Sequence, residues 1–315
     1  MSFYIGIDIG GMSIKAGIVN EEGRILKKST CTTRSNESYE VIVKDIVDLC
    51  DDVLNGYKLK RSDIKGVGIG CPGTVDSGKG IITFAANLNF KNVDIITEFK
   101  KHWDVKCAVN NDANCAAFGE TKFGKDKGIT DALFVTLGTG IGTGFIINGK
   151  IFEGENGAGA EGGHICINMN GKKCSCGEKG CWEAYASATA LLAQTEAAIA
   201  RHPESLMNKL VSEQGLSGKV PFEAYKEGDK TAKRVVKQYV KYIAVGIVNF
   251  INVFRPQVVI VGGGVSNAGE YFIKMIEDEV KLHVFGGSVN KTPHIIKAVL
   301  GNDAGIIGAA AAIME

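Results

Sequence analysis

The sequence predicts an α/β fold made of two similar lobes. Short apolar runs of strand length alternate with stretches whose apolar residues recur at helical spacing, which is the pattern of an α/β domain. A strand–turn–strand unit at residues 5–12 recurs at residues 133–140. The 315 residues are enough for two domains of ordinary size.

The first half of the chain begins with a predicted β-meander. Apolar runs at 4–9 and 16–19 are separated by the breaker Gly10-Gly11, and a glycine turn leads into a third run at 24–26. The elements expected next are a helix over 38–54, buried strands at 66–70 and 105–109, and a helix over 113–120.

The second half repeats this opening. When residues 133–140 are aligned with 5–12, apolar positions coincide and Gly138 falls on Gly10. Two glycine-interrupted hairpins can also match by chance, so duplication is one of two interpretations. The remaining expected elements are helices over 183–200, 230–254 and 304–314 and a strand at 258–261. No linker interrupts the chain, so a boundary between lobes must be a compact hinge.

Composition and charge argue against several classes of function. The 36 basic and 35 acidic side chains give a net charge of +1, so the chain offers no large basic field for nucleic acid or a membrane surface. Asp8 interrupts the apolar run that a signal peptide needs, and the apolar stretch 242–254 is too short to cross a bilayer. We therefore expect a cytoplasmic protein without nucleic-acid or membrane partners.

Three glycine clusters each follow an apolar strand, at residues 8–11, 136–144 and 262–266. Glycine lets backbone N–H groups approach an anion, and Asp8 at the head of the first cluster can hold a metal ion. The second cluster is similar to a dinucleotide fingerprint but leads into a strand rather than a helix. Any one cluster can be a simple turn, whereas the three together, with Lys15 after the first, favour phosphates and Mg²⁺.

The run Asn110-Asn111-Asp112 lies where a strand is expected to end and a helix to begin. One interpretation is a helix N-cap, for which Asn and Asp are favoured. The other is a general base, since catalytic carboxylates of α/β enzymes lie at the carboxyl ends of strands. The residues alone leave both interpretations open.

His164, Cys174, Cys176 and Cys181 form the strongest metal signal in the sequence. Three thiolates and one imidazole are the ligands of a closed tetrahedral zinc site. Glycine, lysine and glutamate are interleaved between these cysteines, which argues against a buried apolar role, and Cys174 and Cys176 lack the CxxC spacing of a redox pair. Other cysteines lie in apolar contexts and are expected in the core: Cys50, Cys71, Cys107 and Cys115.

Together these residues resemble the ROK family of sugar kinases and repressors, and in particular its glucokinase branch. The motifs that follow the family's order are Asp8-x-Gly10-Gly11-x-x-x-Lys15, Gly68-x-Gly70-x-Pro72-Gly73-x-Val75-Asp76 and Asn111-Asp112-Ala113-Asn114. The most specific motif is Glu161-Gly162-Gly163-His164 followed by Cys174-x-Cys176-Gly177-x-x-Gly180-Cys181-x-Glu183. The resemblance covers nearly the whole chain.

The resemblance implies an actin/hexokinase-like fold, in which two ribonuclease H-like lobes enclose a cleft. The smaller lobe would comprise residues 1–118 and 301–315. The larger lobe would comprise residues 119–300, with the zinc loop and the surface of a homodimer.

The resemblance also implies an ATP-dependent kinase that phosphorylates glucose at its 6-hydroxyl, with Mg²⁺ at the phosphates and a structural Zn²⁺. Asp112 would be the catalytic base, and His164 would ligate zinc through one ring nitrogen and bind sugar through the other. The sugar would be bound by Gly73, Asn87, Asn111, Asp112, Glu161, His164 and Glu183. The nucleotide would be bound by Asp8, Gly10, Gly11, Lys15, Gly138, Thr139, Gly140, Gly263 and Gly264.

Met12 departs from the family pattern, which usually has Thr after the first Gly-Gly. Methionine has no hydroxyl to offer a phosphate, and a lost hydrogen bond of this kind is worth about 1 kcal/mol. We therefore expect weaker nucleotide affinity in an active enzyme.

Several alternatives stay open at this point. N-acetylmannosamine or N-acetylglucosamine kinase is the nearest one, and fructokinase is third because its cysteine spacing in this family differs. The family's repressors carry a helix-turn-helix before the Asp-x-Gly-Gly motif, for which the seven residues before Asp8 leave no room. A sugar-binding module without activity would not need Asp8, Asp112 and three glycine loops together.

Overall fold

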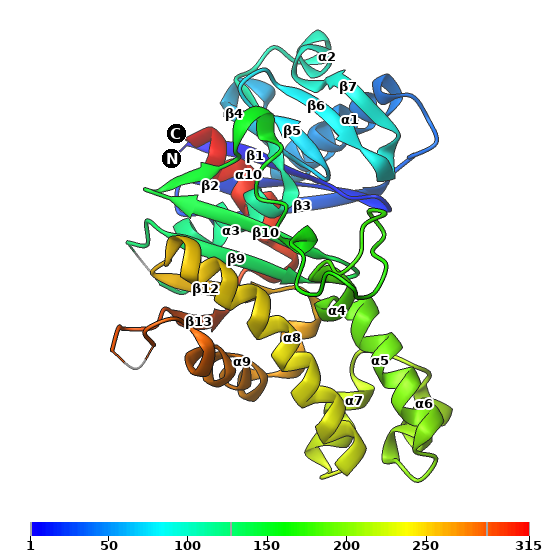
Figure 1. Cartoon of the computed structure of the whole chain (residues 1–315). Helices are drawn as coiled ribbons and strands as arrows, with labels where there is room; N and C mark the ends of the chain where they lie inside the picture. The colour runs from blue at the N-terminus through cyan, green and yellow to red at the C-terminus, as the bar shows by residue number, and fades with distance from the viewer. Residues whose placement is uncertain (1, 127, 288, 315) are drawn as a thin grey trace. The chain divides into compact units, whose positions relative to one another are not determined.

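A computed structural model describes residues 2–126, 128–287 and 289–314 of the chain (Figure 1). The chain divides into two compact units. Unit 1 contains Met1–Ala132, Gly144–Ala160 and Val299–Glu315, and unit 2 contains Leu133–Thr143 and Glu161–Ala298. The lobe boundaries expected from the sequence stay a prediction.

Unit 1 is built on a five-stranded mixed sheet. Its strands, in the order β3-β2-β1-β4-β8, are β3 (Ile25–Thr32), β2 (Ser13–Asn20), β1 (Phe3–Ile9), β4 (Ile64–Cys71) and β8 (Cys107–Asn111). The first three strands form the predicted antiparallel meander, and β4 and β8 run parallel to β1. Asp8 and Asn110 both pair with Gly70 of the strand between them. The sheet therefore aligns the carboxyl ends of β1 and β8 at one edge.

A second, smaller sheet and the helices complete unit 1. The three-stranded sheet contains β5 (Thr74–Asp76), β6 (Ile81–Ala85) and β7 (Phe90–Asp94). The helices are α1 (Tyr39–Tyr57), α2 (Ile95–His102), α3 (Asp112–Phe123) and α10 (Ala304–Met314), with short 3₁₀ turns η1 (Arg61–Asp63), η2 (Ala86–Leu88), η3 (Glu155–Gly157) and η6 (Gly301–Asp303).

A row of glycines lets α10 lie directly on the main sheet of unit 1. Gly6 pairs with Gly17 on one side and Gly68 on the other. A Cβ atom at Gly6 would lie 1.9 Å from the carbonyl oxygen of Ile306, and one at Gly68 would lie 1.8 Å from that of Ala309. Side chains alternate along a strand, so Asp8 shares the face of Gly6 and is brought toward the start of α10.

A second five-stranded sheet follows in sequence, in the order β11-β10-β9-β12-β13. Its strands are β9 (Ala132–Leu137), β10 (Ile141–Ile147), β11 (Lys150–Phe152), β12 (Val258–Gly262) and β13 (His294–Lys297). β10 and β11 are antiparallel, like β2 and β3 of the first sheet. β12 and β13 are parallel, like β4 and β8 of the first sheet. The two sheets have the same strand order, which confirms the predicted duplication.

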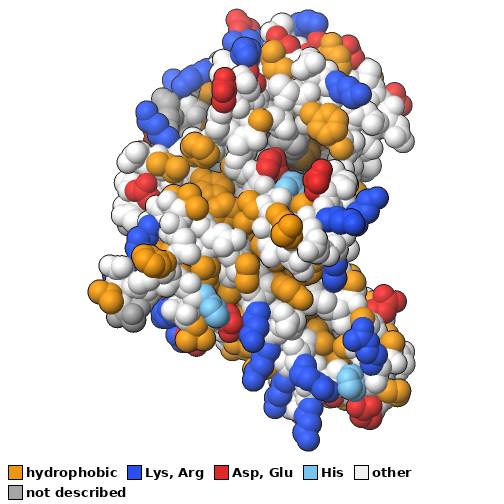
Figure 2. All heavy atoms as spheres, in the orientation of Figure 1, with side chains coloured by type: hydrophobic (Ala, Val, Ile, Leu, Met, Phe, Trp, Pro, Cys, Tyr) orange, Lys and Arg blue, Asp and Glu red, His pale blue; other side chains and the backbone are white. Residues whose placement is uncertain are grey.

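Six α-helices and two 3₁₀ turns of the described residues belong to unit 2. They are α4 (Glu183–Ala186), α5 (Ala188–Arg201), α6 (Leu206–Gln214), α7 (Val220–Lys226), α8 (Lys230–Phe254) and α9 (Glu270–His283), with 3₁₀ turns η4 (Gly162–His164) and η5 (Gly264–Ala268). Figure 2 shows Lys and Arg side chains over the first half of α8, whose opposite face is buried. Among the described residues, no helix is both long and apolar enough for a bilayer span.

The single helix expected over 183–200 is wrong. The chain breaks at Ser187, which has extended backbone angles (φ −74°, ψ 167°) between α4 and α5. The Ser187 hydroxyl oxygen accepts a hydrogen bond from the Ala190 N–H at 3.1 Å, so this serine is the N-cap of a new helix. The bounds expected for α8 and α10 are confirmed.

Candidate functional site

The turn between β1 and β2 carries the first glycine cluster. The Gly10 N–H donates to the Ser13 carbonyl at 2.9 Å, and the Thr33 hydroxyl donates to the Gly10 carbonyl at 2.6 Å. Met12 lies between these bonded positions and its side chain is 87% exposed. The turn is thus fixed by its own hydrogen bonds, with a solvated side chain at its tip.

Asp8 lies at the base of this turn beside two positive features. Lys15 is its cross-strand partner, and the ammonium donates to Asp8 Oδ2 at 3.1 Å. A Cβ atom at Gly305 would lie 2.8 Å from Asp8 Cγ, so only glycine lets the first turn of α10 approach the carboxylate. The N-terminus of a helix carries a partial positive charge. Asp8 is therefore a carboxylate that lies beside the Lys15 ammonium and the start of α10.

Asn111 is the N-cap of α3. Its Oδ1 accepts hydrogen bonds from the N–H groups of Ala113 and Asn114, at 2.9 and 3.1 Å, and its Nδ2 donates to the Gly73 carbonyl at 2.9 Å. Asp112 is the first residue of the helix, and its Oδ1 lies 2.8 Å from the Ala113 nitrogen. The N-cap interpretation is confirmed for Asn111, and Asp112 follows it at the edge of the sheet.

Two buried cysteines lie near both aspartates. Burial raises the pKa of the Cys71 and Cys115 thiols well above the ordinary value, and the negative charges of Asp112 and Asp8 raise them further. Both thiols therefore stay protonated and unreactive, as expected for core residues. The two carboxylates act on the same pair of thiols, in agreement with the alignment of β1 and β8.

Gly73 lies beside the start of α3, and Asn87 lies beside the turn between β1 and β2. Gly73 has a positive φ of 92°, and a Cβ atom there would lie 2.1 Å from the Phe84 carbonyl oxygen, so only glycine fits. Asn87 is exposed on η2, and a Cβ atom at Gly11 would lie 3.4 Å from Asn87 Cβ. The structure thus places Gly73 against Asn111 and Asn87 against the glycine turn.

The second and third glycine clusters lie together in unit 2. The Gly138 N–H donates to the Gly140 carbonyl at 3.0 Å, which closes the turn after β9. Gly263 has a φ of 82°, and a Cβ atom there would lie 2.5 Å from the backbone of Leu137. A Cβ atom at Gly264 would meet nothing within 4 Å. The end of β9 is therefore lined by backbone from both clusters.

Glu183 links the turn after β9 to the cysteine loop. Its Oε2 accepts a hydrogen bond from the Ile141 N–H at 2.9 Å, and its Oε1 accepts one from the Ser175 hydroxyl at 3.1 Å. A Cβ atom at Gly140 would lie 2.3 Å from Oε2, so glycine is required for this contact. One carboxylate therefore holds two segments of unit 2 in register.

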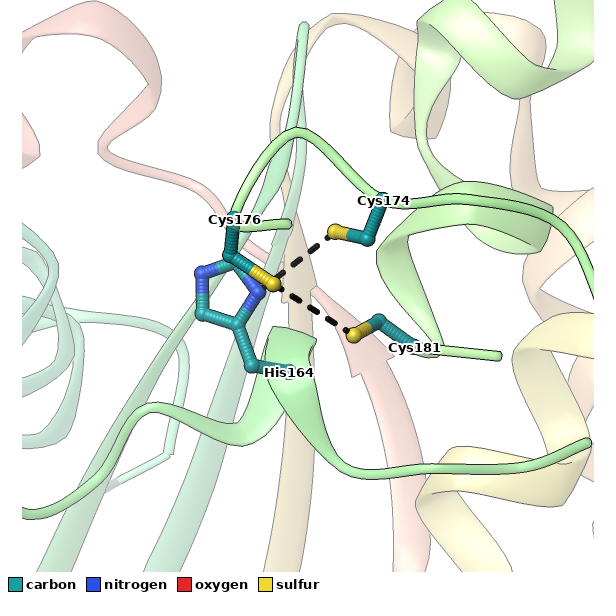
Figure 3. Close-up of side chains that lie close together, drawn as sticks. All are labelled: His164, Cys174, Cys176 and Cys181. Atoms are coloured by element: carbon teal, nitrogen blue, oxygen red, sulfur yellow. Dashed lines mark hydrogen bonds between the residues drawn. The ribbon is translucent and has the colours of Figure 1, made fainter. Parts of the chain in front are cut away.

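His164, Cys174, Cys176 and Cys181 point toward a common centre (Figure 3). Their ligand atoms all lie within 4.8 Å of one another. The distance from His164 Nδ1 to Cys174 Sγ is 3.7 Å, and that from Cys176 Sγ to Cys181 Sγ is also 3.7 Å. Tetrahedral zinc with Zn–S bonds of about 2.3 Å requires a sulfur–sulfur distance of about 3.8 Å. The donor set and its spacing can thus hold a tetrahedral metal ion.

Short backbone bridges shape the loop around this cluster. Cys166 pairs with Cys181, and the Trp182 N–H donates to the Ile165 carbonyl at 2.8 Å. Burial raises the pKa of the Cys181 thiol, whereas a backbone hydrogen bond at Glu178 lowers that of Cys176. A buried thiol of raised pKa becomes a thiolate when a cation binds it. Binding of a cation at the cluster would therefore release the proton of the Cys181 thiol.

Glu161 precedes η4, which carries His164. Its carbonyl oxygen accepts the His164 N–H at 3.1 Å, and its side chain is exposed. The side chain is therefore available at the surface of unit 2 close to the cluster.

Three polar residues beside the α3 N-terminus belong to none of the predicted sets. Asn110 Nδ2 donates to Glu153, and the Ser77 hydroxyl donates to Glu153 Oε2 at 2.6 Å. Asn110 belongs to the run Asn110-Asn111-Asp112, which the sequence indicates as a candidate site, whereas no sequence pattern indicates Ser77 or Glu153. Ser175, which bonds Glu183, was likewise not predicted, although it lies between two predicted ligands.

Comparisons with known proteins show the family and the fold of this chain. A model of the ROK family matches residues 4–315. The chain belongs to the ROK family. A ROK family glucokinase from Streptomyces griseus, solved in complex with glucose and AMPPNP, is 34% identical with a TM-score of 0.83, and the match covers 99% of both chains. The predicted actin/hexokinase-like α/β class is confirmed.

ROK relatives include both enzymes and regulators. The glucokinase of Thermotoga maritima is 36% identical over 313 residues, which are 99% of this chain and 97% of that protein. The xylose repressor of Bacillus subtilis is 28% identical over 313 residues, which are 99% of this chain and 77% of the repressor. Identity is thus higher to the glucokinase, and that match extends over nearly the whole of both proteins.

Proposed function

We propose that this ROK-family chain transfers the γ-phosphoryl group of ATP to the 6-hydroxyl of glucose. The observation that carries the proposal is the similarity to the Streptomyces griseus glucokinase, whose complex holds glucose and an ATP analogue. The Thermotoga maritima glucokinase supports it over the full length. The carboxylates and glycine turns described above are the groups that such a reaction needs.

Asp112 is the proposed catalytic base. Phosphoryl transfer to a hydroxyl requires a carboxylate that accepts the proton as the oxygen attacks. The position of Asp112 after the N-cap of α3 supports this role, because Asn111 satisfies the helix end and Asp112 is not needed as the cap.

The sugar hydroxyls are proposed to bind the residues of the predicted set, namely Gly73, Asn87, Asn111, Asp112, Glu161, His164 and Glu183. Asn111 Nδ2 gives one hydrogen to Gly73, and the second is proposed for the sugar. Glu183 Oε1 accepts hydrogen bonds from Ser175 Oγ and Cys174 Sγ, whereas Oε2 accepts one, from the Ile141 N–H, and has a second lone pair for a sugar hydroxyl.

The nucleotide is proposed to bind through the glycine turns. Asp8 would hold Mg²⁺, and the ammonium of Lys15 would offset phosphate charge beside Gly10 and Gly11. In unit 2, the turn formed by Gly138, Thr139 and Gly140 and the backbone of Gly263 and Gly264 would face phosphates and adenosine. The absence of Cβ atoms at these positions supports close approach of a ligand.

The metal at the cysteine cluster is proposed to be Zn²⁺. Three thiols, one imidazole and the sulfur spacing all support it. Because Nδ1 of His164 faces Cys174, Nε2 remains for a sugar hydroxyl. The ion would fix the imidazole ring in that orientation and would have a structural role.

A coupled assay of ADP release tests the proposal. The sugars are glucose, mannose, fructose, N-acetylglucosamine and N-acetylmannosamine. We expect the highest kcat/KM with glucose, because a site that pairs hydroxyls leaves its own groups unsatisfied when the 2-hydroxyl is replaced by an N-acetyl group. A higher kcat/KM for an N-acetyl sugar would refute the glucose assignment but not the kinase. No ADP release with any sugar would refute the kinase.

The expected homodimer also stays a proposal. Several large apolar side chains of unit 2 are highly exposed, namely Val253, Leu282, Phe285 and Val289. Exposed apolar groups of this kind are typical of surfaces that associate. Light scattering on the purified protein measures its mass and would contradict the dimer if it gave a monomer.

A further inference from the structure

We propose that Glu153 is a positioning residue for the catalytic base and acts through Asn110. The inference rests on the proposed function, in which Asp112 accepts the proton of the sugar hydroxyl. All three residues belong to unit 1. Glu153 and Asn110 are far apart in the chain and meet only because the fold brings the segment after β11 to the end of β8.

Glu153 is held on both its backbone and its side chain. Its carbonyl oxygen accepts the Gly159 N–H at 2.8 Å, and Gly154 follows with a φ of 67° that turns the chain away. Its carboxylate accepts hydrogen bonds from Ser77 Oγ and Asn110 Nδ2. Bonds to a charged acceptor are stronger than those between neutral groups. The carboxylate is therefore a fixed acceptor at the end of β8.

The carboxylate determines which way the Asn110 amide faces. An ionised carboxylate only accepts, so Asn110 must present Nδ2 to Glu153. Oδ1 is then directed the other way, where it accepts the Asn111 N–H at 2.8 Å and Asn114 Nδ2 at 3.2 Å. Asn110 is only 8% exposed, so water has little access to replace a lost partner.

These two bonds act on the segment that carries Asp112. Asn111 and Asn114 flank Asp112 in the first turn of α3, and Asn110 Oδ1 holds both. Without Glu153 the Asn110 amide can rotate and release them. Small displacements of a catalytic group lower the rate of the chemical step, because reaction requires close alignment. The loss should therefore appear in kcat, since Glu153 is not one of the proposed sugar ligands.

The kinetic test compares Glu153→Ala and Glu153→Gln with Glu155→Ala, which removes an exposed glutamate two residues away. We expect Glu153→Ala to lower kcat about tenfold with KM for glucose changed less than about twofold. Glutamine can still accept from Asn110, so Glu153→Gln should restore most of kcat. In an Asn110→Ala background, Glu153→Ala should have no further effect. An unchanged kcat, or an equal loss in both backgrounds, would overturn the proposal.

Hydrogen exchange at the amides of residues 111–114 supplies a test that needs no activity. We expect faster exchange in Glu153→Ala and unchanged exchange in Glu155→Ala. Equal exchange in wild type and Glu153→Ala would overturn the positioning role. If the wild-type protein releases no ADP with any of the sugars tested, the proposed function fails. The exchange result still decides whether Glu153 holds the start of α3.

Discussion

The start of α3 in unit 1 and the cysteine loop in unit 2 are held in place by different means. Around Asp112, backbone and amide groups bond one another: Asn111 caps the helix, and Asn110 bonds Asn111 and Asn114. In the described segment between η4 and α4, the β-pairing consists of isolated bridges, such as that between Cys166 and Cys181. Backbone hydrogen bonds also hold this loop, for example from the Cys174 N–H to the Glu178 carbonyl, and in addition the four candidate ligands converge there.

Substitutions in the two regions should therefore differ in how they affect activity and stability. A segment held by its own hydrogen bonds keeps its shape when one reacting group is exchanged, so its variants should lose activity and remain folded. The proposed zinc ion would add order to the cysteine loop, so variants that lack one of its candidate ligands should lose stability and activity together.

Exchange of Asp112 is expected to have the largest effect on activity. Asp112→Asn keeps the size of the side chain but removes the carboxylate that is proposed to accept the proton, so kcat should fall by about three orders of magnitude or more. Glucose should still bind and the melting temperature should change little. Steady-state kinetics and calorimetric titration with glucose measure the two quantities.

The control for this experiment is Asp126→Asn, which changes an exposed carboxylate just beyond α3 and should leave kcat unaltered. If Asp112→Asn kept more than about a tenth of the wild-type kcat, a loss under about 1.4 kcal/mol, Asp112 would not be the base.

Exchange of Cys181 is expected to affect both metal content and stability. Cys181→Ser removes a buried thiol that is proposed as a zinc ligand, so zinc per chain should fall from one to well below one, the melting temperature should drop, and kcat/KM should fall by about 100-fold. Elemental analysis and calorimetry on protein purified without added metal check this.

Cys166→Ser is the matched control for the metal prediction. Cys166 pairs with Cys181 across the bridge but is exposed and lies outside the cluster. It should retain zinc and stability. Active wild-type protein without zinc, or equal metal loss in both variants, would contradict the ligand assignment.

Much of the fold was predictable where the pattern is long or strongly apolar. The helices α8 and α10 match their expected bounds, because an amphipathic run of 25 residues and a continuous apolar run are both strong helical patterns. The small sheet β5-β6-β7 was not predicted, since its strands have three to five residues and little periodicity. The break at Ser187 was missed because serine is also tolerated inside helices.

The candidate site was predictable only where its residues are close in the chain. The cysteine ligands lie within eight residues of one another, so their spacing alone indicated a metal. The contact of Glu153 with Asn110 joins residues 43 apart and depends on the packing of the β11 loop against β8. The same holds for Glu183 and Ile141, whose bond spans 42 residues.

The link between the cysteine loop and the turn after β9 can be broken at Gly140. In Gly140→Ala the new Cβ would lie 2.3 Å from Glu183 Oε2, so the carboxylate must move and lose the Ile141 N–H. We expect KM for glucose to rise about tenfold, because Glu183 is a proposed sugar ligand. Zinc content should not change, since none of the four ligands is altered.

Gly218→Ala serves as the control for this substitution, because a Cβ atom there meets nothing within 4 Å. It should leave KM for glucose unchanged. The role of the Glu183 link would be contradicted if Gly140→Ala had the same KM as wild type.

The smallest expected effect lies at the tip of the β1–β2 turn. Met12 is 87% exposed, and the turn is held by other groups, with the Thr33 N–H donating to the Met12 carbonyl at 3.0 Å. A side-chain exchange at this position should therefore leave the melting temperature unchanged.

Met12→Thr adds a hydroxyl that can donate to a phosphate, and a gain of about 1 kcal/mol corresponds to about a fivefold lower KM for ATP. Met12→Ala separates the new hydroxyl from the loss of the methionine side chain and should keep the wild-type KM. If both variants lowered KM equally, the methionine would be obstructing the nucleotide, and the missing hydroxyl would not be the cause of weaker binding.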